Sequence, residues 1–256
     1  MKNIFLIGLF VIFSATIFSQ SNAENSSARG KRIYNNLCSS CHGVLGDGNG
    51  PVASTVSTKP RDFTSGTFKF RSTESGKLPT DQDLYKTISR GIKSTIMPAF
   101  SGLEENDRWE IVKYLKTFSP RFSDVGELPL EELKIENRIL TSPESVSKGK
   151  LIYAQMKCGM CHGDKGDGNG PSSTGMVDVW ENPVQPRDLI SAHESKTAKD
   201  QIDIYRIFTT GLDGTPMPSY KDAMNDADRW HLANYVFELR RNENFYGDVV
   251  IPEESH

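Results

Sequence analysis

The cysteines of this chain occur in two short clusters, and each cluster ends in a histidine. The clusters are Cys-Ser-Ser-Cys-His at 38–42 and Cys-Gly-Met-Cys-His at 158–162. A Cys-x-x-Cys pair can act as a redox dithiol, contribute to a zinc site or close a disulfide. A redox dithiol leaves the adjacent histidine unexplained, and a zinc site would have to join two pairs that lie 120 residues apart. A disulfide that closes so small a loop would be strained.

Covalent attachment of haem accounts for all the residues of each cluster. Two thiols one short turn apart can each add to a vinyl group on the same edge of a porphyrin. The next residue is then held beneath the iron, where histidine serves as the proximal ligand. The sequence therefore predicts two covalently attached haems c, with these residues in contact with them: Cys38, Cys41, His42, Cys158, Cys161 and His162.

The second half of the chain repeats the first, and the repeat indicates the second iron ligand. The segment Gly-Asp-Gly-Asn-Gly-Pro at 46–51 recurs unchanged at 166–171. Met97 and Met217 are each followed by proline, and each lies 55 residues after the histidine of its own cluster. A thioether is a soft ligand, and a His/Met pair raises the reduction potential of a haem. We predict both methionines as iron ligands; the alternative is that they only fill gaps in the core.

Hydrophobic periodicity predicts three short helices in each repeat that must position these ligands. In the first repeat, one helix runs from about Ala28 into Cys38, and another begins at a capping box at Thr80 and stops at Gly91. The last helix of each repeat and the middle helix of the second are indicated by spaced apolar residues: Ile111, Leu115, Phe118, Ile204, Phe208, Leu232, Val236 and Leu239. Long loops join the helices, so we expect each domain to depend on its haem for a complete core.

The N-terminal segment has the layout of a secretory signal peptide. Lys2 precedes an apolar run from Ile4 to Phe18, and polar residues follow, with cleavage predicted after Ala23. The alternative is an uncleaved anchor, but the run has 15 residues and a membrane span needs about 20. We therefore predict a periplasmic or otherwise exported protein with no membrane span after cleavage.

These signals divide the chain into five parts. The parts are a signal peptide (1–23), a first haem domain (24–118), an interdomain linker (119–147), a second haem domain (148–240) and a C-terminal tail (241–256). The linker contains three prolines and more acidic than basic residues. The formal net charge of −3 argues against a partner nucleic acid.

The pattern resembles the class I cytochromes c in a tandem, diheme form, over about 30–118 and 148–240. The resemblance implies an all-α fold of two tandem cytochrome c domains, each with about three short helices and long loops around a covalently bound haem. It implies that the first and last helices cross through a glycine and aromatic residues. The candidates are Gly30, Tyr34 and Tyr114 in the first domain, and Gly149 and Tyr153, one residue further from the first cysteine, in the second.

The resemblance also concerns the surroundings of the iron ligands. In the family, a proline carbonyl after the attachment site accepts a hydrogen bond from the ligand histidine, and Pro51 and Pro171 match that position. Arg61 and Arg187 are candidates to pair with haem propionates, or else lie in solvated loops.

The function implied is electron transport, with no catalytic residue. The chain would carry single electrons outside the cytoplasm between respiratory or dehydrogenase partners, with both irons His/Met ligated. Donor and acceptor would be redox proteins. One alternative is a diheme enzyme of the cytochrome c peroxidase type, which needs an iron with an open or displaceable position. Another is an electron-transfer subunit of a larger redox complex.

Overall fold

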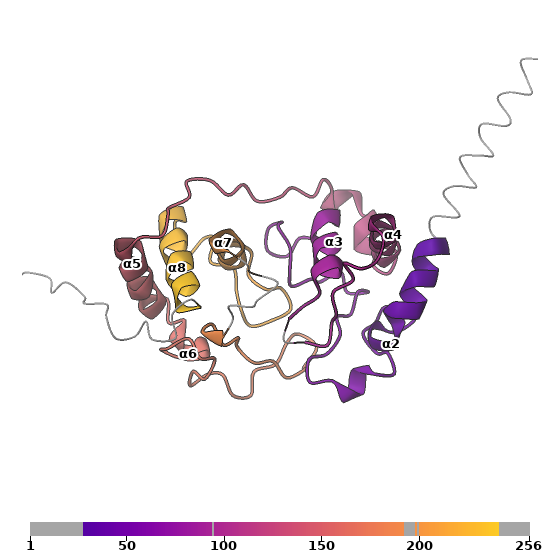
Figure 1. The fold of residues 1–256 in the computed structure, drawn as a ribbon, viewed down its shortest axis with the longest axis horizontal. Helices are drawn as coiled ribbons and strands as arrows, with labels where there is room; N and C mark the ends of the chain where they lie inside the picture. Colours follow the sequence, from indigo (N-terminus) through magenta and orange to yellow (C-terminus); the bar gives the residue numbers. More distant parts are fainter. Residues whose placement is uncertain (1–27, 94, 192–197, 199, 241–256) are drawn as a thin grey trace, which may run out of the picture.

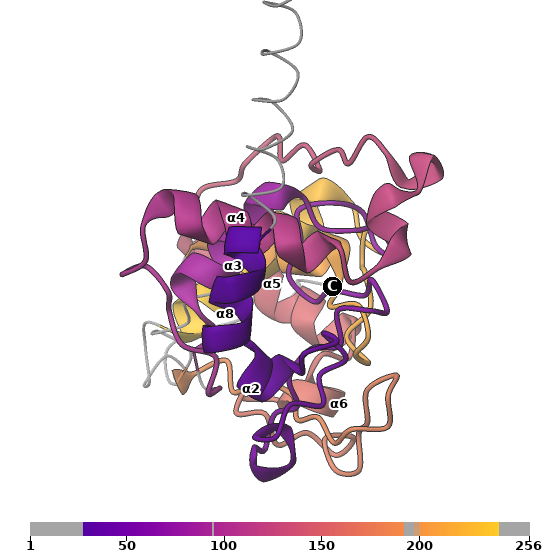
Figure 2. The same cartoon turned by 90° about the vertical axis from the view of Figure 1, so that its right-hand side faces the viewer.

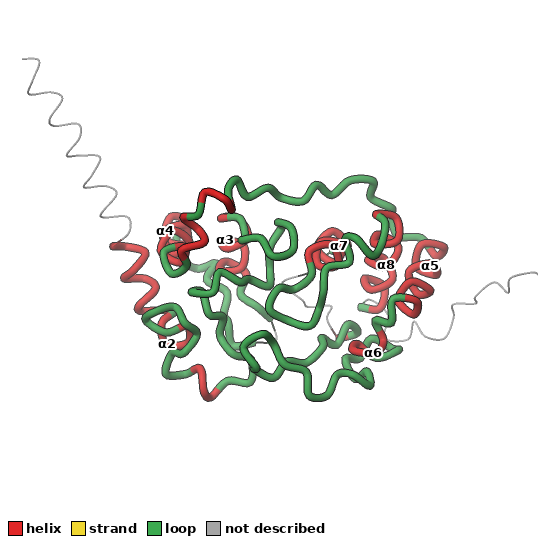
Figure 3. Tube along the Cα trace, turned by 180° about the vertical axis from the view of Figure 1, so that it is seen from behind, coloured by secondary structure: helices red, strands yellow, loops and turns green. Residues whose placement is uncertain are grey.

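The computed structural model describes residues 28–93, 95–191, 198 and 200–240. The predicted signal peptide and C-terminal tail lie outside these residues. The described chain consists of helices and loops, with an isolated β-bridge between Val177 and Pro183 and no strand. Figure 3 shows how much of the chain between the helices is loop. The prediction of an all-α fold is confirmed, and no helix in the described ranges is long and apolar enough to cross a membrane.

The first domain contains the predicted helices. In chain order its elements are a helix over 28–37, α2 (Ser39–His42), the short 3-10 helix η1 (Ala53–Thr55), α3 (Asp81–Arg90) and α4 (Glu105–Lys116). The capping box predicted at Thr80 is present, because its hydroxyl accepts from the backbone N–H of Asp83 while the Asp83 carboxylate accepts from that of Thr80. Gly91 ends α3 with a φ of 63°, a conformation that favours glycine.

After two 3-10 helices in the linker, the second domain repeats the order of the α-helices. The elements of this part are the 3-10 helices η2 (Pro120–Ser123) and η3 (Val125–Glu127), followed by α5 (Pro143–Gln155), α6 (Gly159–His162), α7 (Gln201–Thr210) and α8 (Asp226–Leu239). Helix α5 begins five residues before the predicted domain start at 148. Ser142 caps it by accepting from the N–H of Ser145, and Pro143 occupies its first turn.

The two domains lie side by side with their helices in mirrored order. Along the long axis, Figure 1 shows α5, α8 and α7 of the second domain, and then α3, α4 and the helix over 28–37 of the first. The middle helices α3 and α7 therefore face the junction between the domains. Figures 1 and 2 place the attachment helices α2 and α6 toward one side of the molecule, while the linker passes along the opposite side.

Each domain has its own hydrophobic core at the crossing of its first and last helices. A Cβ on Gly30 would lie 2.2 Å from the carbonyl oxygen of Glu110, and one on Gly149 would lie 2.1 Å from that of His231. The backbones of the crossing helices are in direct contact there, as the resemblance implied. The edge-to-face tyrosine pairs beside them have centroid separations of 5.3 and 5.5 Å, and are Tyr34–Tyr114 and Tyr153–Tyr235.

The extra residue between Gly149 and the second attachment site does not disturb this crossing. Helix α5 ends in a Schellman motif, with Lys157 in the left-handed conformation at a φ of 54°. The N–H of Lys157 donates to Ala154 and that of Cys158 donates to Tyr153, both at 3.0 Å. The additional residue is therefore absorbed at the end of the helix, after the crossing.

Candidate haem sites

All eight predicted attachment and ligand residues line one continuous cavity of about 520 Å³. They are Cys38, Cys41, His42 and Met97 of the first domain and Cys158, Cys161, His162 and Met217 of the second. The wall of the cavity is mostly apolar, and both domains contribute to it. The two sites, which are 120 residues apart in sequence, therefore open into a shared space at the domain junction.

A backbone carbonyl orients each predicted ligand histidine. Nδ1 of His42 lies 3.0 Å from the carbonyl oxygen of Arg61, and Nδ1 of His162 lies 3.0 Å from that of Arg187. A carbonyl oxygen can only accept, so Nδ1 carries the proton in both rings. Nε2 of each imidazole is then left with the lone pair that an iron requires.

The roles expected of Pro51 and Pro171 are therefore wrong, because the arginine carbonyls make these bonds. Both prolines are exposed, on a turn that is held against the attachment helix by the N–H of the preceding glycine. The loop that reaches the histidine lies further along the chain. It passes close to Gly48, whose Cβ would lie 2.8 Å from the carbonyl oxygen of Pro60. The segment Pro-Arg-Asp, which occurs at 60–62 and again at 186–188, marks this loop in the sequence of both domains.

Burial shifts the pKa of several predicted ligand and attachment residues. Desolvation lowers the pKa of His42 and His162, which favours the neutral imidazole that binds metal. The ring of His42 also stacks on Phe63, with centroids 4.4 Å apart. Desolvation raises the pKa of the Cys38 thiol to about 12 and that of Cys158 to about 11.

The alternatives to haem attachment gain no support from the geometry. The four cysteines form no disulfide. Among the described residues, no three histidine, cysteine or acidic side chains are grouped to hold a metal ion. A redox dithiol requires a lowered thiol pKa, whereas burial raises that of Cys38 and Cys158.

The methionine loops of the two domains have the same internal hydrogen bonds. In the first, the N–H of Ile92 donates to the carbonyl of Met97 at 3.1 Å, and the N–H of Met97 donates to Thr95 Oγ1 at 3.1 Å. The corresponding bonds of the second loop, from Leu212 to Met217 and from Met217 to Thr215, measure 3.0 and 3.2 Å. The repeat thus folds both methionines into the cavity wall in the same way.

The charged side chains that line the cavity are basic in the part of the chain that the structure describes. Seven basic and no acidic residues from the described ranges line it, in a chain whose net charge is negative: Lys59, Arg61, Lys69, Lys93, Lys157, Arg187 and Arg240. Arg61 does not lie in a solvated loop, because its guanidinium stacks 4.4 Å from the ring centroid of Trp180 in the other domain. A mostly apolar wall that includes basic side chains fits a porphyrin with its anionic propionates.

Two known proteins are similar to this chain. The CcoP subunit of a cbb3-type cytochrome c oxidase from Azospirillum sp. (strain B510) is 26% identical over 227 residues, which are 83% of this chain and 62% of that protein. This chain therefore spans less than two thirds of that relative. A chain of the reducing HAO-like protein complex of Kuenenia stuttgartiensis is 38% identical, with a TM-score of 0.79 over 82% of this chain and 95% of that one.

The cytochrome c family matches the sequence twice, at residues 27–119 and 146–240. The two matches fall on the two helical domains, each with one Cys-x-x-Cys-His segment. The predicted fold of two tandem cytochrome c domains is confirmed, and the chain belongs to the cytochrome c family.

Proposed function

We propose that this chain is a diheme electron-transfer protein in which each domain binds one haem c. The observation that carries the proposal is that both Cys-x-x-Cys-His segments and both methionine loops line one mostly apolar cavity that basic side chains also line. When bound, each haem would supply a one-electron Fe(II)/Fe(III) couple.

The chain's own residues orient the ligands and keep water away. The Arg61 and Arg187 carbonyls fix the tautomer and the ring plane of the two histidines. Apolar side chains from α3 and α7, including Ile88 and Phe208, line the cavity and exclude water from it. These features serve a carrier, whose ligands stay in place while the oxidation state changes.

The partners that we propose are redox proteins within a larger complex. The two relatives are, by name, a subunit of a cytochrome c oxidase and a chain of an HAO-like protein complex. The proposal includes export after removal of the predicted signal peptide. Size-exclusion chromatography of the native protein tests the association, and the mass of the mature chain tests cleavage after Ala23.

A carbon monoxide titration separates a carrier from a diheme enzyme. The reduced wild-type holoprotein is expected to keep its optical spectrum, because histidine and methionine close both irons. Met97→Ala and Met217→Ala are each expected to open one iron, so that about half of the haem signal responds. Redox titration should show a lower potential for that haem alone.

Met176→Ala is the matched control, because Met176 also lines the cavity but has no counterpart in the first domain. Its spectrum should not respond to carbon monoxide. A wild-type protein in which half of the haem signal responds at once would instead favour a peroxidase-type enzyme with one open iron.

A further inference from the structure

The two methionine loops differ in the charge of one matched residue. Asp213 lies in the loop that carries Met217, and Lys93 occupies the equivalent position, 120 residues earlier, in the loop that carries Met97. Both loops have the same internal hydrogen bonds. Asp213 is therefore not needed for the loop's own fold.

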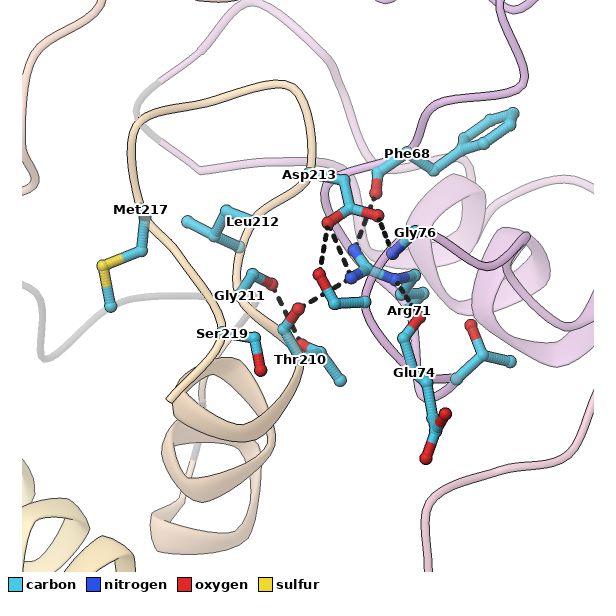
Figure 4. Close-up of polar contacts among 12 residues, drawn as sticks. Phe68, Arg71, Glu74, Gly76, Thr210, Gly211, Leu212, Asp213, Met217 and Ser219 are labelled. Carbon is cyan, nitrogen blue, oxygen red and sulfur yellow. Dashed lines mark hydrogen bonds and ion pairs between the residues drawn. The ribbon is translucent and has the colours of Figure 1, made fainter. Parts of the chain in front are cut away.

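The Asp213 carboxylate makes its hydrogen bonds to the other domain. It accepts from Nη2 of Arg71 at 2.8 Å, from the backbone N–H of Gly76 at 2.7 Å and from the hydroxyl of Ser75 at 3.2 Å. Figure 4 shows this carboxylate next to the Arg71 guanidinium and Gly76. One turn of the first domain thus holds a residue of the second domain's methionine loop.

Arg71 connects the two domains, and all three nitrogens of its guanidinium donate hydrogen bonds. Its side chain is fully buried. Nε donates to the carbonyl of Glu74 at 3.0 Å and Nη1 to that of Phe68 at 3.1 Å, both in its own domain. Nη2 donates to the carbonyl of Thr210 at 2.7 Å, at the end of α7. A buried arginine with these acceptors allows little displacement of the groups that it joins.

We propose that the Arg71–Asp213 contact positions Met217, so that the first domain determines how firmly the second site holds its methionine. Arg71 holds Asp213 through this contact and Thr210 through a second hydrogen bond, and these two residues are the ends of the segment that enters the loop. Leu212, between them, bonds to the carbonyl of Met217. Figure 4 shows Met217 on the side of the loop away from Arg71.

A second ion pair between the domains provides a control. Lys221 and Glu74 form an ion pair, but their side chains are 43% and 55% exposed, so the pair contributes little. Lys221 lies beyond the methionine, outside the segment that Arg71 holds. Lys221→Ala removes an interdomain ion pair without changing the Arg71–Asp213 contact.

The test uses the full-length diheme protein and rests on the proposed function, because it requires Met217 as an iron ligand. In Asp213→Asn and in Arg71→Gln, carbon monoxide is expected to change the signal of one reduced haem, about half of the total, whereas the wild-type spectrum stays unchanged, because a charge-assisted hydrogen bond is lost. The same haem should have a lowered potential, and Met217→Ala identifies it as the second. Lys221→Ala should match the wild type.

The double variant Arg71→Met/Asp213→Leu removes the buried charge together with its partner, and so tests the contact if the single variants do not fold. It should respond like a single variant, since both act on one contact. Variants that retain two haems and, like the wild type, keep their spectrum under carbon monoxide would overturn the proposal. Failure of the proposed function would give different results. The wild-type protein would lack two haems, or the second iron of Met217→Ala would still not bind carbon monoxide.

Discussion

Replacing Cys38 and Cys41 together with serine is expected to yield a protein with one haem per chain instead of two. Serine has no thiol to add to a vinyl group, so the first domain would lose both covalent links. The remaining haem should stay on Cys158 and Cys161, whose attachment helix is separate. The haem-to-protein ratio and the mass of the intact chain measure the outcome.

The same variant should lose much of the stability of its first domain. The residues Phe63, Phe68 and Leu84 belong to that domain's buried core and also line the cavity. Without the haem, this apolar surface faces water or an empty space, and either is destabilising. Thermal unfolding should show an early transition that wild type lacks.

Ser39→Ala/Ser40→Ala is the control, because it changes the two residues between the cysteines and leaves the thiols. It should retain two haems. The reciprocal variant, with serine at both 158 and 161, should also retain one haem. A Cys38/Cys41 variant that still carries two covalently bound haems would contradict the assignment of these cysteines.

Features determined by neighbouring residues were predictable from the sequence. The capping box at Thr80 and the helix end at Gly91 depend on residues within one helix and its flanks. The start of α5 has the same kind of signal, which is serine followed by proline at 142–143. The predicted domain start at 148 did not take this signal into account. Local chemistry determines such features, so the order of residues is enough to find them.

Features that depend on the path of a loop were not predictable in this way. The acceptors for the histidines were expected at Pro51 and Pro171, which match a family position by their distance from the histidine. In the structure the acceptors are 19 and 25 residues from the histidines, in loops of different length. A fixed number of residues from the histidine does not locate the acceptor in both domains, because this loop has six additional residues in the second domain.

Contacts between the domains were even less predictable from the sequence. Arg71 and Asp213 are 142 residues apart, and Arg71 lies in a stretch with no counterpart in the second repeat. Alignment of the repeats shows where the domains are alike, whereas this contact depends on where they differ. The shared cavity is equally a product of how the domains pack, which neither repeat encodes alone.

Gly30→Ala and Gly149→Ala are each expected to destabilise their own domain by about 3 kcal/mol or more. The added methyl group would lie 2.2 Å or 2.1 Å from a backbone carbonyl oxygen of the crossing helix. No rotamer change relieves a clash between a Cβ and a backbone, so the helices must separate and the tyrosine pairs beside them must move. Denaturant unfolding, followed by haem absorbance and far-UV circular dichroism, measures the loss.

Gly102→Ala is the matched control, because among the described residues no atom beyond its chain neighbours lies within 4 Å of its added methyl group. Its unfolding should agree with wild type within about 0.5 kcal/mol. The two crossing variants should lose similar amounts, because Lys157 absorbs the extra residue of the second domain outside the crossing. If Gly149→Ala unfolds like Gly102→Ala while Gly30→Ala does not, the additional residue loosens the second crossing. The two domains would then share the same helices but not the same close helix packing.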